Sequence, residues 1–194
     1  MLEESELKAT LDTCIIFPVT ACDALLTLAE FGMFQPIWSS SILNELIRTT
    51  TDSFQPFEHR GLRKRVEEMN EFFPYAIHDA PSSVVYRWQL ALPDPKDGHV
   101  VATAIASKSS LIITENLRDF PNHLLTKLGI AAVSFDSFMT TMLTSDPETV
   151  HKAFKNMIKK RTNPQISLLE QLLKLENLSP NFNREFRKYL NTLD

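Results

Sequence analysis

Hydrophobic positions along the chain alternate between short continuous runs and stripes with helical spacing. Apolar runs rich in β-branched residues at positions 9–17, 35–39, 110–114 and 130–135, with a weaker run at 75–78, predict strands. Apolar residues three or four positions apart predict helices over 21–31, 41–48, 57–72, 81–90, 97–107 and 122–128. Strands that alternate with helices form parallel sheets covered on both faces. We therefore expect an α/β fold with a parallel sheet of four or five strands, in a Rossmann-like sandwich complete by about residue 135.

The pattern changes after residue 136, where no further strand is indicated. Residues 137–194 predict three or four amphipathic helices, with prolines at 147, 164 and 180 near their starts. Leu168, Leu172 and Leu175 form an apolar stripe that must be buried, and we expect it to pack on the chain's own α/β domain. The sequence thus predicts an α/β domain at residues 1–144 and an all-α C-terminal extension at residues 145–194.

Composition narrows the class of protein. Hydrophobic residues make up 43% of the 194 positions, which favours a folded core over disorder. Two cysteines, Cys14 and Cys22, argue against a disulfide framework or a zinc site. The acidic first residues and the lack of a long apolar run favour a cytoplasmic protein without a membrane partner. A net charge of −4 disfavours coating of nucleic acid by charge alone but is compatible with an acidic site that holds cations.

Four carboxylates occupy comparable places in the predicted topology. Asp12 lies in or after the first strand, and Glu45, Asp97 and Asp119 lie near helix starts or just after a strand. In a parallel α/β sheet these places face one crevice. Clustered carboxylates repel one another unless a cation is bound, and an all-oxygen ligand set suits Mg²⁺ or Mn²⁺. Two such ions would activate water against a phosphodiester.

Each carboxylate also has a simpler explanation when it is considered alone. Asp97 suits a helix cap, Glu45 a solvated helix face and Asp119 a turn. Asp12 is harder to explain in this way, because an aspartate within an apolar run needs a partner or a function.

Four short motifs occur in order between about residues 8 and 140, at 11–13 (LDT), 38–46 (WSSSILNEL), 92–104 (LPDPKDGHVVATA) and 112–121 (IITENLRDFP). Together they resemble the signatures of PIN domains. The proline-flanked Asp94 and the fourth motif resemble a bacterial subfamily, classed with VapC-type toxins, that often has a helical C-terminal extension. The resemblance implies a metal-dependent endoribonuclease, with RNA as substrate, an antitoxin protein as partner and a possible homodimer.

The resemblance also implies roles for individual residues. Asp12, Glu45 and Asp97 correspond to the core metal ligands and Thr114 to a group that holds a water or phosphate oxygen. The fourth motif supplies Asn116 and Asp119 as further candidates, Asn116 also for substrate binding, and leaves open which of the two faces the metal.

Lys96, Gly98 and His99 of the third motif lie within two positions of Asp97. Gly98 stands where the subfamily has an arginine, which would weaken a phosphate contact, and Lys96 stands where it has an acidic residue. His99 is expected to face away from the metal ligands and to have a structural role.

Two other functions compete with the ribonuclease. A haloacid-dehalogenase-like phosphatase also begins with an aspartate after a strand, but it needs a second aspartate where this chain has Cys14. A catalytically silent protein-interaction module of the same fold is the second alternative, and the presence of all four acids counts against it.

Basic residues gather at two places. The first group suits a solvated helix surface, and it consists of Arg60, Arg63, Lys64 and Arg65. The second group is unusually basic for an acidic protein and suggests a phosphate or a carboxylate-rich partner. It consists of Lys152, Lys155, Lys159, Lys160 and Arg161.

Overall fold

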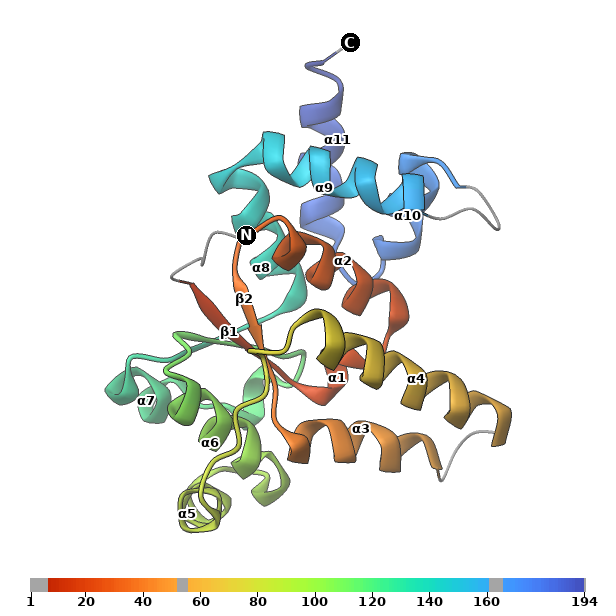
Figure 1. Ribbon diagram of the computed structural model, residues 1–194. Helices are drawn as coiled ribbons and strands as arrows, with labels where there is room; N and C mark the ends of the chain where they lie inside the picture. Colours follow the sequence, from red (N-terminus) through yellow and green to blue (C-terminus); the bar gives the residue numbers. More distant parts are fainter. Residues whose placement is uncertain (1–6, 52–55, 161–165, 194) are drawn as a thin grey trace.

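The computed structural model describes residues 7–51, 56–160 and 166–193. Its centre is a sheet of four parallel strands in the order β2-β1-β3-β4, of which Figure 1 labels β1 and β2. The strands are β1 (Lys8–Leu11), β2 (Gln35–Ile37), β3 (Leu111–Ile113) and β4 (Ala131–Val133). This arrangement confirms the predicted α/β class and the parallel sheet. The weaker strand candidate at 75–78 gives only an isolated bridge between Ile77 and Trp38.

The predicted helices occur in the expected order with small shifts at their ends, and the described residues add three short helical turns that were not predicted. They are α1 (Thr13–Ile16), α2 (Val19–Glu30), α3 (Ser40–Thr51), α4 (Pro56–Phe72), α5 (Ser82–Ala91), η1 (Pro95–Asp97), α6 (Gly98–Ser107), η2 (Leu117–Asp119), α7 (Asn122–Leu125), η3 (Thr126–Leu128), α8 (Phe135–Ser145), α9 (Pro147–Lys160), α10 (Leu168–Leu175) and α11 (Pro180–Leu190).

The first strand is shorter than its apolar run predicted. The chain leaves the sheet at Asp12, whose carbonyl accepts hydrogen bonds from the amides of Ile15 and Ile16 at 3.0 and 3.2 Å. Both isoleucine side chains are buried, so the run is apolar because it forms a buried helical turn, α1. The prediction of one strand from residue 9 to 17 was therefore wrong beyond Leu11.

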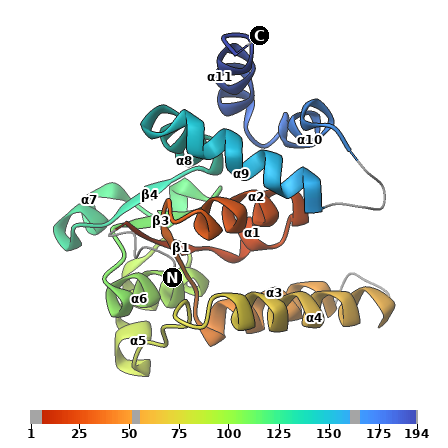
Figure 2. The ribbon, with the colours of Figure 1, turned by 45° about the horizontal axis from the view of Figure 1, so that its top comes forward.

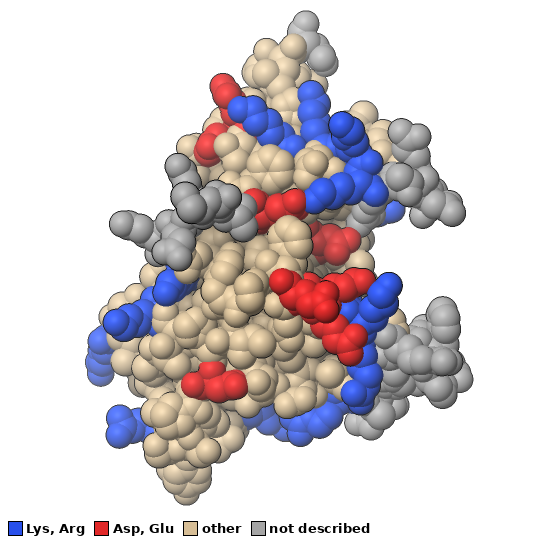
Figure 3. Space-filling view, viewed as in Figure 1, with Lys and Arg blue, Asp and Glu red and all other residues tan. Residues whose placement is uncertain are grey.

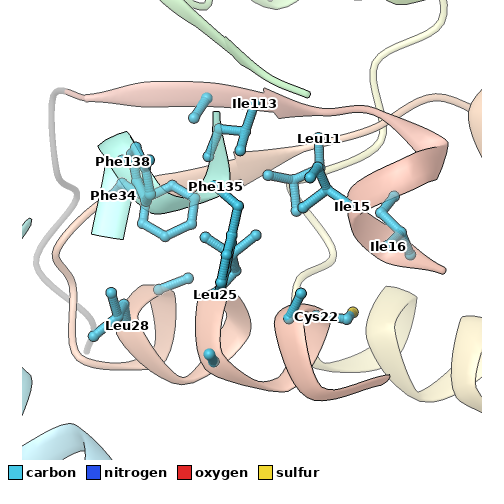
Figure 4. Close-up of a cluster of buried hydrophobic side chains, with 14 of the residues drawn as sticks. Leu11, Ile15, Ile16, Cys22, Leu25, Leu28, Phe34, Ile113, Phe135 and Phe138 are labelled. Atoms are coloured by element: carbon cyan, nitrogen blue, oxygen red, sulfur yellow. The ribbon is translucent and has the colours of Figure 1, made fainter. Parts of the chain in front are cut away.

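Helices cover both faces of the sheet. In Figure 2, α2 lies on one side and α6 with α5 on the other. Figure 4 shows the core on the α2 side, where Leu25 and Leu28 of α2 face Phe34, Phe135 and Phe138 beneath the strands. The rings of Phe34 and Phe138 make an edge-to-face contact, with centroids 4.9 Å apart, and both are almost completely buried.

Gly98 allows α5 and α6 to approach closely. A Cβ atom at this position would lie 2.6 Å from the backbone nitrogen of Gln89 and 2.7 Å from its Cγ. Real Cβ atoms do not come so close to backbone, so no larger residue fits here without moving α5. The glycine that replaces the expected arginine therefore has a packing reason.

The C-terminal helices pack on the rest of the chain. Phe154, Phe182 and Phe186 are fully buried, and their ring centroids lie 5.4 to 5.5 Å apart. Helices α9 and α10 contact α2, and α11 contacts α8. The carboxylate of Asp136 in α8 accepts the backbone N–H of Phe182 at 2.9 Å, which fixes the start of α11.

The expected leucine stripe is buried in this helical region. Leu172 and Leu175 are fully buried and Leu168 is half-buried, so the stripe packs within the chain as expected. The division of the chain between residues 144 and 145 falls at the end of α8, and we retain it as a proposal. In the described parts of the chain, no helix is both long and apolar enough to cross a membrane.

Candidate metal-binding active site

The four predicted carboxylates lie on four different elements that meet at one edge of the sheet. Asp12 directly follows β1, Glu45 lies in α3, Asp97 ends η1 and Asp119 ends η2. Since β1 and β3 are parallel neighbours, the segments after them leave the sheet at the same edge. Asp12, Asp119 and Glu45 all act electrostatically on Asp97, so the four side chains lie in one region.

Asp12 is held in a defined orientation. Its side chain is 4% exposed, and its Oδ2 accepts a hydrogen bond from Thr114 Oγ1 at 2.7 Å. Cys14 Sγ donates to the same oxygen at 3.1 Å. The backbone N–H of Asn116 donates to Thr114 Oγ1 at 3.0 Å, so the hydroxyl hydrogen is directed toward Asp12. Thr114 thus links the end of β1 to the loop after β3, and its hydroxyl is occupied by protein groups.

Glu45 has two partners on neighbouring elements. Its Oε2 accepts a hydrogen bond from Thr13 Oγ1 at 2.6 Å and lies 3.3 Å from His99 Nε2. Its pKa is lowered, first by the interaction with His99, and burial opposes this effect. His99 Nδ1 lies 2.7 Å from the carbonyl oxygen of Lys96, which can only accept a hydrogen bond.

His99 therefore faces the carboxylates, and the expectation that it faces elsewhere was wrong. With one ring nitrogen against a carbonyl and the other against a carboxylate, both nitrogens suit a proton. Burial lowers the pKa of His99, but the contacts with Glu45 and the Lys96 carbonyl outweigh burial and raise it. The 3.3 Å contact is an ion pair and not an aligned hydrogen bond. The expected hydrogen-bonding role is present, but it acts on the site.

The pKa of Asp97 indicates that the carboxylates interact electrostatically. Burial and repulsion from Asp12, Asp94, Asp119 and Glu45, in that order, raise the pKa of Asp97 to about 7. Its side chain makes no capping hydrogen bond at the start of α6, so the helix-cap explanation does not account for it.

Asp94 shapes the loop before Asp97, because it accepts the backbone N–H of Lys96 at 2.9 Å.

The fourth motif presents two different side chains. Asp119 is largely shielded, lies 3.6 Å from Arg118 Nε and contributes to the repulsion at Asp97. Asn116 is exposed, and its backbone N–H contacts Thr114. Asp119 therefore acts electrostatically on Asp97, whereas Asn116 is neutral and cannot be compared with it in this way.

Whether a divalent cation fits the site depends on the donor atoms and on the negative charge of the carboxylates. Among the described residues, no three aspartate, glutamate, histidine or cysteine side chains converge as a preformed cation site. Asp12 and Glu45 instead each turn an oxygen to a hydroxyl group. The available donors are carboxylate and amide oxygens, which Mg²⁺ and Mn²⁺ prefer. The pKa of Asp97 is raised first by burial and then by repulsion from neighbouring carboxylates, and a divalent cation would compensate that negative charge. The residues fit such an ion.

Sequence reasoning missed the roles of Thr13 and Cys14 and the orientation of His99. Thr13, Cys14 and His99 each contact one of the carboxylates. Their positions one or two residues from Asp12 and Asp97 were the available signal, but their orientation depends on α1 and α6.

The basic residues near α9 lie away from this site. In Figures 1 and 2, α9 lies across α2, on the side of the sheet opposite α3 and α6. Lys160 forms an ion pair with Glu30 of α2.

In the other basic group, Arg65 of α4 donates to the carbonyl oxygen of Ile16 at 2.8 Å and so joins α4 to α1. Arg161 and the side chain of Arg60 lie outside the described residues.

Comparison with known proteins agrees with the motifs. A family model described as PIN domain matches residues 8–118, more than half of the chain, including Asp12, Glu45 and Asp97. No curated protein and no solved structure matches the chain. PIN domains are generally metal-dependent nucleases with a nucleic acid as substrate. With its parallel sheet and its carboxylates at one sheet edge, the chain belongs to the PIN-domain family.

Proposed function

We propose that the protein is a metal-dependent endoribonuclease that hydrolyses RNA phosphodiester bonds and acts as the toxin of a type II toxin–antitoxin pair. The observation that supports this function best is the shared field at Asp97, whose pKa is raised by burial and by the surrounding carboxylates. An enzyme whose reaction needs bound divalent cations keeps such a field, whereas a surface used only for protein contacts has no need of it.

The ligand set follows from the proposed function. Asp12, Glu45, Asp97 and Asp119 would hold Mg²⁺ or Mn²⁺, and Asn116 would contribute a neutral oxygen or contact the substrate. When bound, the metal would activate a water molecule and stabilise the leaving oxygen of the phosphodiester.

Other residues orient this set. Thr114 fixes the Oδ2 of Asp12, while Thr13 and His99 hold Glu45 between α1 and α6. Preorganised ligands reduce the cost of ordering the site when the ion and the substrate bind.

Cleavage of single-stranded RNA is the direct test. Purified protein should cleave RNA with Mg²⁺ or Mn²⁺ and lose activity in excess chelator. Asp12→Asn and Asp97→Asn should lower the rate by about two to four orders of magnitude, because each removes a charged ligand. Glu71→Gln, an exposed carboxylate of α4, is the matched control and should cleave like wild type. Undiminished cleavage in chelator, or wild-type rates for both site variants, would refute the proposed function.

The toxin role needs a cellular measurement. Induced expression in a bacterial host should arrest growth, and expression of Asp97→Asn to the same level should not. Normal growth with the wild-type protein, under conditions where it is active in extracts, would leave a ribonuclease without the toxin role. The antitoxin and a homodimer remain predictions, and co-purification and sedimentation measure them.

A further inference from the structure

A polar groove of about 950 Å³ adjoins the acidic cluster at Glu45 and His99. Helices α3, α4 and α5 form its walls together with the segment from η1 to α6. Arg48, Arg63 and Lys96 bring cationic side chains to it from three of these elements. The groove therefore starts at a candidate metal ligand and continues along a basic surface.

The charge of the groove is opposite to that of the molecule. Among the described residues that line it, Glu45 is the only carboxylate, although the chain as a whole carries a net charge of −4. Figure 3 shows acidic side chains gathered over α4 and basic ones along the lower edge beneath α3. The positive charge attracts a polyanion to the groove, and the acidic surface elsewhere repels it.

The three groove cations are available to bind a ligand. Within the described residues, no ion pair or side-chain hydrogen bond of Arg48, Arg63 or Lys96 is present, although Arg48 acts electrostatically on Glu45. Neighbouring cations differ in this respect, since Lys64 pairs with Glu68 at 3.4 Å and Arg65 binds a backbone carbonyl. Surface cations that have no direct ion pair and line one groove suit phosphate oxygens.

The remaining lining residues suit an unpaired strand. Asn44 and Gln89 bring amide groups that donate and accept hydrogen bonds, and Ile47 and Val85 add apolar contacts. Base edges and ribose hydroxyls are accessible to such groups in single-stranded RNA, whereas a duplex is recognised mostly by its shape across the shallow minor groove.

We propose that this groove binds the single-stranded RNA segment next to the scissile phosphate, with Arg48, Arg63 and Lys96 as its phosphate contacts. The proposal rests on the proposed ribonuclease function and adds a direction to it. The RNA leaves the acidic cluster past Glu45 and His99 and runs between α3 and α5. Phosphate contacts fix the register of the strand, and the amides contact its bases or riboses.

A charge-matched pair of triple variants tests the groove. Arg48→Ala, Arg63→Ala and Lys96→Ala are combined in one protein, and Lys64→Ala, Lys152→Ala and Arg184→Ala in the other. All three control cations are exposed and ion-paired on the surface. Both proteins lose the same charge, so a nonspecific electrostatic effect is equal in the two. The probe is fluorescent single-stranded RNA of random sequence, titrated in excess chelator at several salt concentrations, with a duplex of equal length as second probe.

Wild type and control should bind the single strand with the same salt dependence. The groove variant should bind more weakly, with a slope of log affinity against log salt that is shallower by about 0.7 for each lost phosphate contact, or about two in total. Equal weakening of both triple variants would overturn the groove. Equally tight, groove-dependent binding of the duplex would overturn the single-strand assignment.

The binding and cleavage experiments can refute the two proposals independently. Groove-dependent binding by a protein that never cleaves RNA would refute the proposed ribonuclease and leave the groove in place. Metal-dependent cleavage by wild type, with a groove variant that binds RNA like the control, would refute the groove and leave the ribonuclease.

Discussion

Replacing Asp97 by asparagine should stabilise the metal-free protein at neutral and alkaline pH. The carboxyl group has a pKa of about 7 in the folded chain, against an ordinary value of 3.8, because of burial first and then of the neighbouring carboxylates. Folding therefore favours the protonated form. The stability associated with this group is fully present below about pH 3.8 and is lost as pH rises through about 7. Asparagine resembles the protonated form at every pH.

The magnitude follows from the size of the shift. A shift of about three pKa units corresponds to about 4 kcal/mol at 1.36 kcal/mol per unit, for a group fully shielded from water. Asp97 is only partly buried, so solvent screening reduces the effect, and we expect about 1–2 kcal/mol. The contribution of His99 to the stability of the folded protein is also lost as pH rises, because its pKa is raised. The difference between wild type and variant largely removes this contribution.

Urea denaturation in excess chelator measures the effect. At about pH 8 the Asp97→Asn protein should be more stable than wild type by the stated amount, and the difference should shrink toward about pH 4. Glu71→Gln controls for the loss of one surface carboxylate. A variant as stable as wild type at both pH values, or less stable at about pH 8, would refute the idea that burial and repulsion disfavour the charged form of Asp97.

Three other changes test separate features. Gly98→Ala should lower the free energy of unfolding by about 1–3 kcal/mol, since its Cβ would meet the backbone of Gln89, and equal stability in urea would show that α5 yields freely. Truncation after Asp146 should expose the apolar surface that α9–α11 cover and give aggregates in light scattering, so a monodisperse, fully active product would contradict the packing. His99→Gln should reduce kcat more than it changes the KM for RNA and should raise the metal concentration needed for half-activity, because Glu45 loses its partner on α6. An unchanged metal requirement would mean that His99 does not position Glu45.

Most of the fold followed from hydrophobic spacing, and the failures have local causes. Helices with long stripes, such as α2 and α4, were predicted to within a few residues, because amphipathic spacing is distinctive over three or more turns. The run after Asp12 misled because a short buried helical turn and a strand end look alike when every residue is apolar.

The candidate ligands were predictable because topology alone brings strand ends and helix starts together. Their partners were not. Whether His99 faces Glu45 depends on the rotation of α6, which is set by the close contact at Gly98 with α5. The hydroxyl partner of Glu45 is Thr13, which lies 32 positions away in the sequence. No local sequence pattern predicts such a contact.

The order of the strands has a consequence for the timing of synthesis. The central strand β1 is made first, but its neighbour β3 comes about a hundred residues later, and Thr114 contacts Asp12 across a separation of 102 residues. A growing chain therefore has Asp12 and Glu45 long before it has Asp97, β3 and Asp119. Because long-range contacts form only when both partners exist, the four carboxylates stay apart until most of the chain has left the ribosome. A protein that cuts RNA would thus be made beside ribosomal and messenger RNA in a form whose active site is not yet assembled.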